Sequence, residues 1–217
     1  MILSSMTYSE IAETFRREIH SVEPKIRDAA RKFGGMVKKS RSGSIHQVFD
    51  VSTKDKTILH LIFISKKKSD WNRPGLCIYS TFHYKDGLNA ISINGTEGVA
   101  FIHNSHFFNR YGERIVKDME IGENELIRRF MLNNQDLLWH KNTDDYSLAY
   151  KKYEKEKIPQ LAARVEEGNC FIEKLGDNLY LMKTIISDEM LKNNQPAAFS
   201  ELEEKRLYFA KKANLDG

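Results

Sequence analysis

The residues best placed to do chemistry lie in one segment, 103–114, which reads His-Asn-Ser-His-Phe-Phe-Asn-Arg-Tyr-Gly-Glu-Arg. A helix that begins at Ser105 turns about 100° per residue, and it would place four polar residues on one stripe: His106, Arg110, Glu113 and Arg114. Its apolar side would hold Phe108, Tyr111 and Ile115. An imidazole beside two guanidiniums can act as a general base on a phosphodiester while the arginines hold the phosphate oxygens.

The same stripe also fits an amphipathic helix without a catalytic role, in which the arginines pair with Glu113 and with carboxylates elsewhere. The sequence leaves both interpretations open. His103 and His106 are three residues apart and could bind a metal, but no third ligand follows at a recognisable spacing. We therefore expect no metal site and no cofactor.

A second point of interest is the predicted strand 179–186, which is apolar on both faces except at Lys183 and Thr184. Strict alternation would place Lys183 on one face with Leu181 and Ile185. An unpaired ammonium there is costly, so we expect it to point toward the His106 helix, to meet a carboxylate or to extend past the end of the strand. His60 and His83 lie inside other predicted strands and are interpreted as hydrogen-bonded core or sheet-face residues.

Together, the helix with His-x-x-x-Arg-x-x-Glu-Arg and a later strand meander ending in Lys-Thr resemble a pattern in small prokaryotic toxin-type ribonucleases. That group includes barnase-, EndoU-, colicin- and RelE-like nucleases, and the resemblance covers residues 103–190. It implies a metal-independent ribonuclease in which three kinds of residue surround the scissile phosphate. These are a histidine on a helix, basic residues, and a residue on a late strand. The residues implied here are His106, Arg110, Arg114, Lys183 and Thr184.

Charge is concentrated in two runs, although the net charge is only +4. Residues 20–45 hold seven basic and two acidic residues, and Lys66-Lys67-Lys68 forms a second run. Such runs can bind a polyanion by neutralising its phosphates, in which case Lys38, Lys39 and Arg41 would contact RNA. They can equally be solvated turns and a solvent-facing helix side.

The order of elements predicts an α+β fold. Thr7-x-x-Glu10 is a capping box for a first helix, and Pro24 begins a second that Gly34-Gly35 ends. Five strands of a mostly antiparallel sheet follow, with 57–64 central, and then a helical middle that includes 124–133 and 143–157. A three-stranded meander and C-terminal helices complete either one domain, 1–217, or two parts, 1–103 and 104–217.

Composition narrows the functional class. No apolar run approaches the ~20 residues that span a bilayer, and the N-terminus does not read as a signal peptide, so we expect a cytoplasmic protein with no membrane partner. Cys77 and Cys170 are expected to be buried thiols. No phosphate-binding glycine loop, nucleophile elbow or dinucleotide motif is present. The leading hypothesis is metal-independent RNA cleavage; the alternative is a non-catalytic cytoplasmic binding module for a protein or polyanion partner, held by the sheet face and the basic N-terminal arm.

Overall fold

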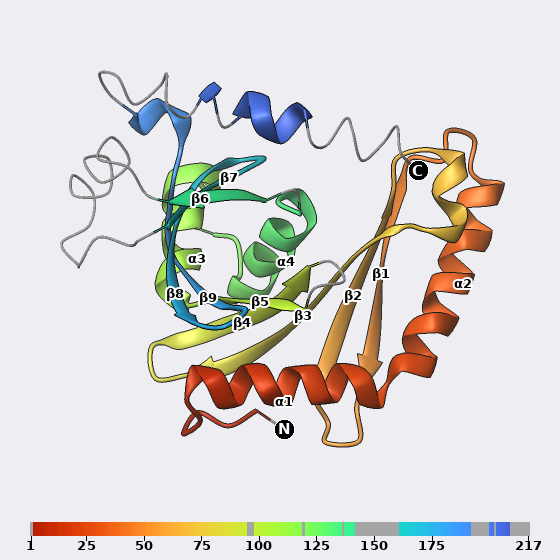
Figure 1. The fold of residues 1–217 in the computed structure, drawn as a ribbon, viewed down its shortest axis with the longest axis horizontal. Coiled ribbons are helices and arrows are strands. Elements are labelled where there is room, and N and C mark those ends of the chain that lie inside the picture. The colour runs from red at the N-terminus through yellow and green to blue at the C-terminus, as the bar shows by residue number, and fades with distance from the viewer. Residues whose placement is uncertain are drawn as a thin grey trace.

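The computed structural model describes residues 2–94, 98–118, 120–135, 137–141, 161–191, 200–201 and 203–208. Within these ranges nine strands join in one mixed sheet, in the order β1-β2-β3-β4-β5-β9-β8-β7-β6 (Figure 1). The strands are β1 (Ile45–Ser52), β2 (Ile58–Ser65), β3 (Gly75–Tyr84), β4 (Gly87–Asn94), β5 (Val99–His103), β6 (Leu138–Lys141), β7 (Leu161–Val165), β8 (Gly168–Gly176) and β9 (Leu179–Ile186).

Helices cover both faces of this sheet. One face packs against α1 (Tyr8–Ser21) and α2 (Glu23–Lys39), and the other packs against α3 (Ser105–Tyr111) and α4 (Glu123–Asn133) (Figure 1). Three short helical segments are also present among the described residues: η1 (Lys68–Asn72), η2 (Gly112–Val116) and η3 (Asp188–Met190). The predicted capping box of α1 is confirmed, because the Thr7 and Glu10 side chains each cap the other's backbone amide.

Each face has its own hydrophobic cluster. On the α1–α2 face, Phe15 and Phe33 pack with strand residues such as Leu61. On the α3–α4 face, Tyr111 and Phe130 pack with a different set of strand residues. All of these side chains are buried. Alternating residues of a strand enter different clusters, as Ile91 and Ala90 of β4 do, because successive side chains of a strand point to opposite faces.

The α+β class is confirmed, but the description of a five-stranded sheet with a separate three-stranded meander is wrong. Strands β1 to β5 pair antiparallel in sequence order, and β5 then pairs in parallel with β9, where Ala100 lies opposite Leu179. This parallel pair satisfies the backbone edges that both strand groups would otherwise expose. Strands from both halves of the chain therefore form one continuous sheet.

Two other expectations about the strands fail. The strand expected over 57–64 is β2, which lies second from the edge, whereas β5 occupies the middle of the sheet. Strand β6 was not predicted; it pairs with β7 at the far edge. The helix predicted over 143–157 lies outside the described residues.

The second helix does not end at Gly34-Gly35 as predicted. It continues to Lys39, with Gly34 buried inside it. A Cβ atom built on Gly34 would lie 2.4 Å from the Trp71 carbonyl oxygen. The glycine therefore permits the close approach of η1 to α2, and this contact outweighs its weak helix propensity.

Both cysteines are buried, as expected, and burial raises the pKa of the Cys77 thiol to about 12. Among the described residues no helix is both long and apolar enough to cross a bilayer.

Candidate functional site

The His106 helix forms where the sequence predicts it. Asn104 caps α3 by accepting a hydrogen bond from the Phe107 amide, and Phe108 and Tyr111 are buried as expected. Ile115 is only partly buried, while His106 and Arg110 are partly exposed on the other side. The amphipathic assignment of α3 is therefore confirmed.

The stripe loses its regular spacing after Tyr111. In η2 the Lys117 amide donates to the Gly112 carbonyl, five residues back, which is the wider π-type turn. Arg114 reaches β9, where its Nη1 donates to Thr184 Oγ1 at 3.0 Å and to the Ile185 carbonyl at 3.1 Å. Two of the predicted site residues, Arg114 and Thr184, thus lie in contact.

Lys183 lies beside Thr184 in an irregular part of β9. Phe171 pairs with Thr184 while the next residue of β8, Ile172, pairs with Met182, so Lys183 is the extra residue of a β-bulge. Its Nζ lies 3.8 Å from Glu173 Oε2, and Glu173 pairs with Leu181, which faces α1 and α2. The expected carboxylate partner is confirmed, but the bulge breaks the predicted alternation.

These positions bear on the catalytic interpretation of α3. Arg110 forms an ion pair of 2.7 Å with Glu113, and Arg114 is bound by β9. Lys183 pairs with Glu173. Acid, base and charge-stabilising groups act together only when they reach one reacting centre. The arrangement therefore favours the structural interpretation of the stripe.

The two basic runs meet at one end of the sheet. The C-terminal part of α2 packs against η1, and Lys38 Nζ lies 3.3 Å from the centre of the Trp71 ring. Gly43, with a positive φ of 77°, lets the chain pass close to the Lys67 and Lys68 backbone. We call this surface the basic end; it comprises Lys38, Lys39, Arg41, Lys66, Lys67, Lys68, Trp71 and Arg73.

Hydrogen bonds fix the lysine run in this position. Asp70 accepts hydrogen bonds from the Lys66 and Lys67 amides, and Ser65 Oγ donates to the Gly43 and Lys67 carbonyls. All of the basic end is exposed except Lys67, which is partly exposed. The tertiary structure thus joins seven cations, which the sequence places in separate runs, around one exposed aromatic ring.

A further group of polar residues was missed by the sequence analysis. Register places Asp50, His60 and Tyr79 side by side on β1, β2 and β3. His60 Nδ1 lies 2.7 Å from Asp50 Oδ1, and the imidazole stacks on the Tyr79 ring at 4.6 Å between centroids. Because an ionised carboxylate is only an acceptor, Nδ1–H donates to Asp50.

This row forms one wall of an open groove of about 520 Å³, and the exposed side of α4 contributes residues of the other wall. We call it the His60 groove; it is lined by Val48, Asp50, His60, Tyr79, Thr81, Asn124, Glu125 and Arg128. Burial, and then the Asp50 charge, raise the pKa of the Tyr79 phenol to about 12, so the phenol stays protonated at neutral pH. In the sequence, the sign of this group is a histidine within an otherwise apolar strand. Spacing along one strand does not show which residues of the neighbouring strands lie beside it.

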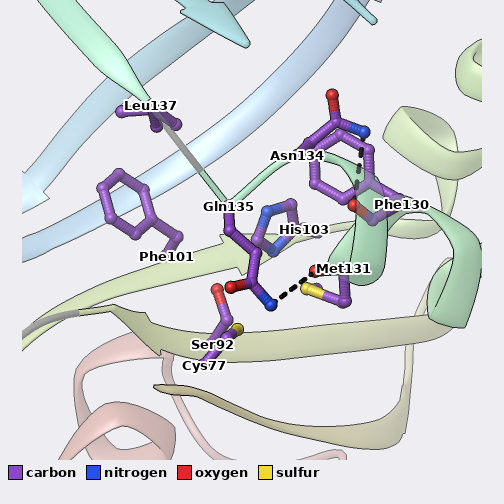
Figure 2. A pocket seen from close by; sticks show the side chains of 9 residues that line it. All are labelled: Cys77, Ser92, Phe101, His103, Phe130, Met131, Asn134, Gln135 and Leu137. Atoms are coloured by element: carbon purple, nitrogen blue, oxygen red, sulfur yellow. Dashed lines mark hydrogen bonds between the residues drawn. The ribbon is translucent and has the colours of Figure 1, made fainter. Parts of the chain in front are cut away.

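His103, at the end of β5, lines a different and much smaller cavity of about 10 Å³, close to the least that can hold a water molecule (Figure 2). Its ring packs among Phe107, Phe108 and Phe130, and its Nδ1 has no hydrogen-bond partner among the described residues. Burial lowers the pKa of His103 to about 3, so it is a neutral core residue.

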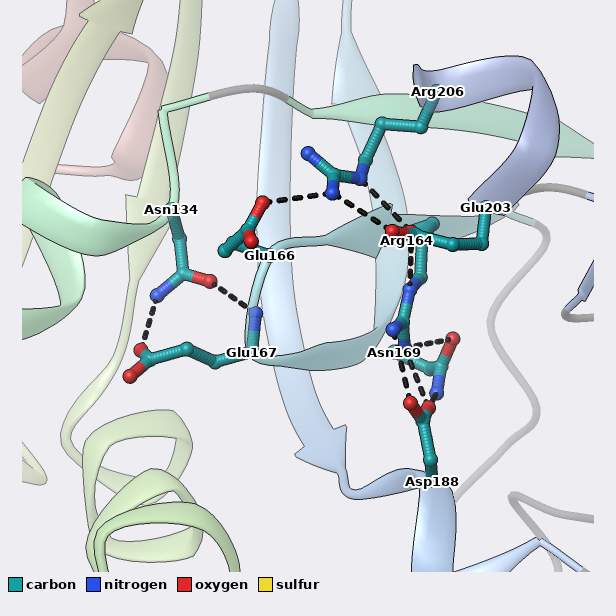
Figure 3. A network of polar contacts seen from close by, with 8 residues as sticks. All are labelled: Asn134, Arg164, Glu166, Glu167, Asn169, Asp188, Glu203 and Arg206. Atoms are coloured by element: carbon teal, nitrogen blue, oxygen red, sulfur yellow. Dashed lines mark hydrogen bonds and ion pairs between the residues drawn. The ribbon is translucent and has the colours of Figure 1, made fainter. Parts of the chain in front are cut away.

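The C-terminal helical segment, 200–201 and 203–208, is attached to the sheet by ion pairs (Figure 3). Glu203 accepts hydrogen bonds from two buried guanidiniums, those of Arg164 at 2.8 Å and Arg206 at 2.8–2.9 Å. Arg164 also binds Asp188, and Arg206 binds Glu166. Nearby, Asn134 and Glu167 exchange hydrogen bonds between the end of α4 and the β7–β8 turn.

No known family model, curated protein or solved structure matches this chain. The similarity to toxin-type ribonucleases therefore stays a prediction. Function has to be inferred from the residues themselves.

Proposed function

We propose that this protein binds RNA through the basic end. The observation that carries the proposal is the convergence of two basic runs, 38–41 and 66–68, around the exposed Trp71 ring. Lysines and arginines that neutralise phosphates release counterions, and this release drives much of nucleic-acid binding. Within the basic end the one acidic neighbour on η1, Asp70, is engaged by backbone amides.

Trp71 suits a single-stranded ligand. Trp71 is 42% exposed, and Lys38 Nζ lies over the centre of one face of the ring. Unpaired bases stack on aromatic rings, whereas the bases of a duplex are covered by their neighbours. A cationic surface with one aromatic platform is therefore better matched to single-stranded RNA than to a rigid duplex.

We do not propose cleavage at α3. Arg110 and Arg114 are bound by protein groups, and Lys183 pairs with Glu173. The basic end needs none of these residues to bind RNA.

Replacing Lys38, Lys39 and Arg41 with alanine should weaken binding of a single-stranded RNA oligonucleotide and flatten its salt dependence. Each lost phosphate contact lowers the slope of log Kd against log salt by about 0.7, so the expected change is about 2. Fluorescence anisotropy over a salt series measures this slope.

The matched control is the triple alanine variant at Arg27, Arg31 and Lys32. It removes the same charge from the earlier turns of α2, where these side chains pair with Glu23 and Asp28. A smaller change of slope is expected there. Equal effects in the two variants would mean that net charge alone matters, and no binding at low salt by the unaltered protein would refute the proposal.

Trp71→Ala tests the stacking platform separately. Base stacking on an aromatic ring contributes about 1–3 kcal/mol, so affinity for single-stranded RNA should fall roughly 5- to 150-fold with little change in the salt slope. Affinity for a blunt RNA duplex should change less. If both ligands lose affinity equally, Trp71 acts by holding Lys38 rather than by stacking.

A further inference from the structure

The His60 groove has the composition of an acid–base site. Asp50 holds the His60 ring through Nδ1, which leaves Nε2 as the nitrogen able to take a proton from a bound molecule. The Tyr79 ring stacks on one face of the imidazole. His60 is 23% exposed, so a ligand in the groove can reach it while β2 and β3 fix its position.

Arg128 supplies a cation on the facing wall. It forms an ion pair of 3.6 Å with Glu125 three residues earlier, and both side chains are more than half exposed. Such exposed surface pairs contribute little to stability. A phosphate, which an arginine can bind through two parallel hydrogen bonds, can therefore replace Glu125 as the partner of Arg128.

Because α2 and α4 cover opposite faces of the sheet, RNA held at the basic end reaches the groove around the end of the sheet at Ser65. Within β2, His60 and Ser65 are about 17 Å apart along the strand, at about 3.3 Å per residue. The lysine run follows Ser65 directly. A strand of a few nucleotides covers this distance. A groove of about 520 Å³ is in the size range of small-molecule sites and can hold one nucleotide unit.

We propose that the His60 groove cleaves single-stranded RNA without a metal, with His60 as the general base; this proposal rests on RNA binding by the basic end. His60 Nε2 removes the proton of a ribose 2′-hydroxyl, and the 2′-oxygen attacks the adjacent phosphorus. The bond from phosphorus to the 5′-oxygen breaks, and that oxygen takes a proton from water in the open groove. The products are a 2′,3′-cyclic phosphate and a 5′-hydroxyl, and His60 returns its proton to solvent.

The other groups have defined parts in this reaction. Arg128 binds the non-bridging phosphate oxygens, where negative charge develops. Asp50 is a positioning residue, which keeps the imidazole oriented and stabilises it when protonated. The charged and titratable groups that line the groove around His60 are Asp50, Tyr79, Glu125 and Arg128.

The test incubates the full-length protein with a labelled single-stranded RNA at low salt in the presence of a chelator, and analyses the ends of the products. Loss of a general base costs about 10²- to 10⁴-fold, so His60→Gln should abolish measurable cleavage while RNA affinity is unchanged. An RNA with a single 2′-deoxy substitution at the scissile nucleotide should bind but resist cleavage. The matched control is His83→Gln, which alters an exposed histidine of β3 and should cleave normally.

Asp50→Asn separates positioning from folding. The variant removes the carboxylate that orients the imidazole, so kcat should fall while RNA affinity is unchanged, and Asp50→Glu should restore part of the rate. A merely structural role would lower the RNA affinity and the stability of the protein together with the rate.

Two results would overturn the proposal. If the protein binds RNA but does not cut it, the catalytic proposal is refuted and the proposed RNA binding stands. If the protein does not bind RNA, the proposed function itself is refuted. Cleavage that survives His60→Gln but is lost in His106→Gln assigns the chemistry to α3 instead.

Discussion

Acidification from pH 7 to about pH 4.5 is expected to lower the free energy of unfolding by about 2–3 kcal/mol through His103 alone. Its side chain is 3% exposed among aromatic rings, and burial holds its pKa at about 3. In the unfolded chain a histidine has a pKa of about 6.5. Below that value the unfolded state binds a proton that the folded state excludes, so stability falls until the pH approaches the folded pKa.

His103→Phe should abolish this part of the pH dependence. The variant should be close to the unaltered protein in stability at pH 7, because an apolar ring replaces a side chain whose Nδ1 has no partner. At about pH 4.5 it should be the more stable of the two by about 2–3 kcal/mol in urea unfolding. Ser92→Ala, which alters the same cavity without removing a titratable group, should keep the original pH dependence. Equal pH dependence in His103→Phe and the unaltered protein would contradict the prediction.

Glu203→Gln should release the C-terminal helical segment from the sheet. The carboxylate lies between two buried guanidiniums, and removing one member of such a network costs several kcal/mol when the remaining charges stay buried. Arg164 and Arg206 each keep another carboxylate, so we expect a smaller loss of about 2–3 kcal/mol. Hydrogen exchange of residues 200–208 should accelerate accordingly.

The matched control is Glu201→Gln on the same segment. Glu201 pairs with Lys205 at an exposed position, so its loss should cost about 0.5 kcal/mol or less. Arg206, and then Arg164, lower the pKa of Glu203 to about 2. Its stabilising contribution is therefore complete above about pH 4.5 and is lost as the pH falls toward 2. If both variants exchange at the rate of the unaltered protein, the segment is held by other contacts.

Local signals in the sequence determined most of the elements. The capping box at Thr7, the cap at Asn104 and the alternating strands from Ile45 to His103 act over a few residues, so their effect is legible without a partner. The amphipathic face of α3 was predicted for the same reason. Where a local signal met a tertiary contact the contact prevailed, as at Gly34, which packs against Trp71 instead of ending α2.

Only the tertiary structure decided which functional groups meet. Asp50 and His60 pair because β1 and β2 adopt one register, and a shift of one residue would turn their side chains to opposite faces. A single bulge at Lys183 changes the faces of the residues that follow it, so that Ile185 does not share a face with Leu181. The close packing of α2 and η1 joins two basic runs that lie about 25 residues apart in the chain. Periodicity gives the face of a residue within its own element, but register, bulges and packing depend on distant segments and set the distances between chemical groups.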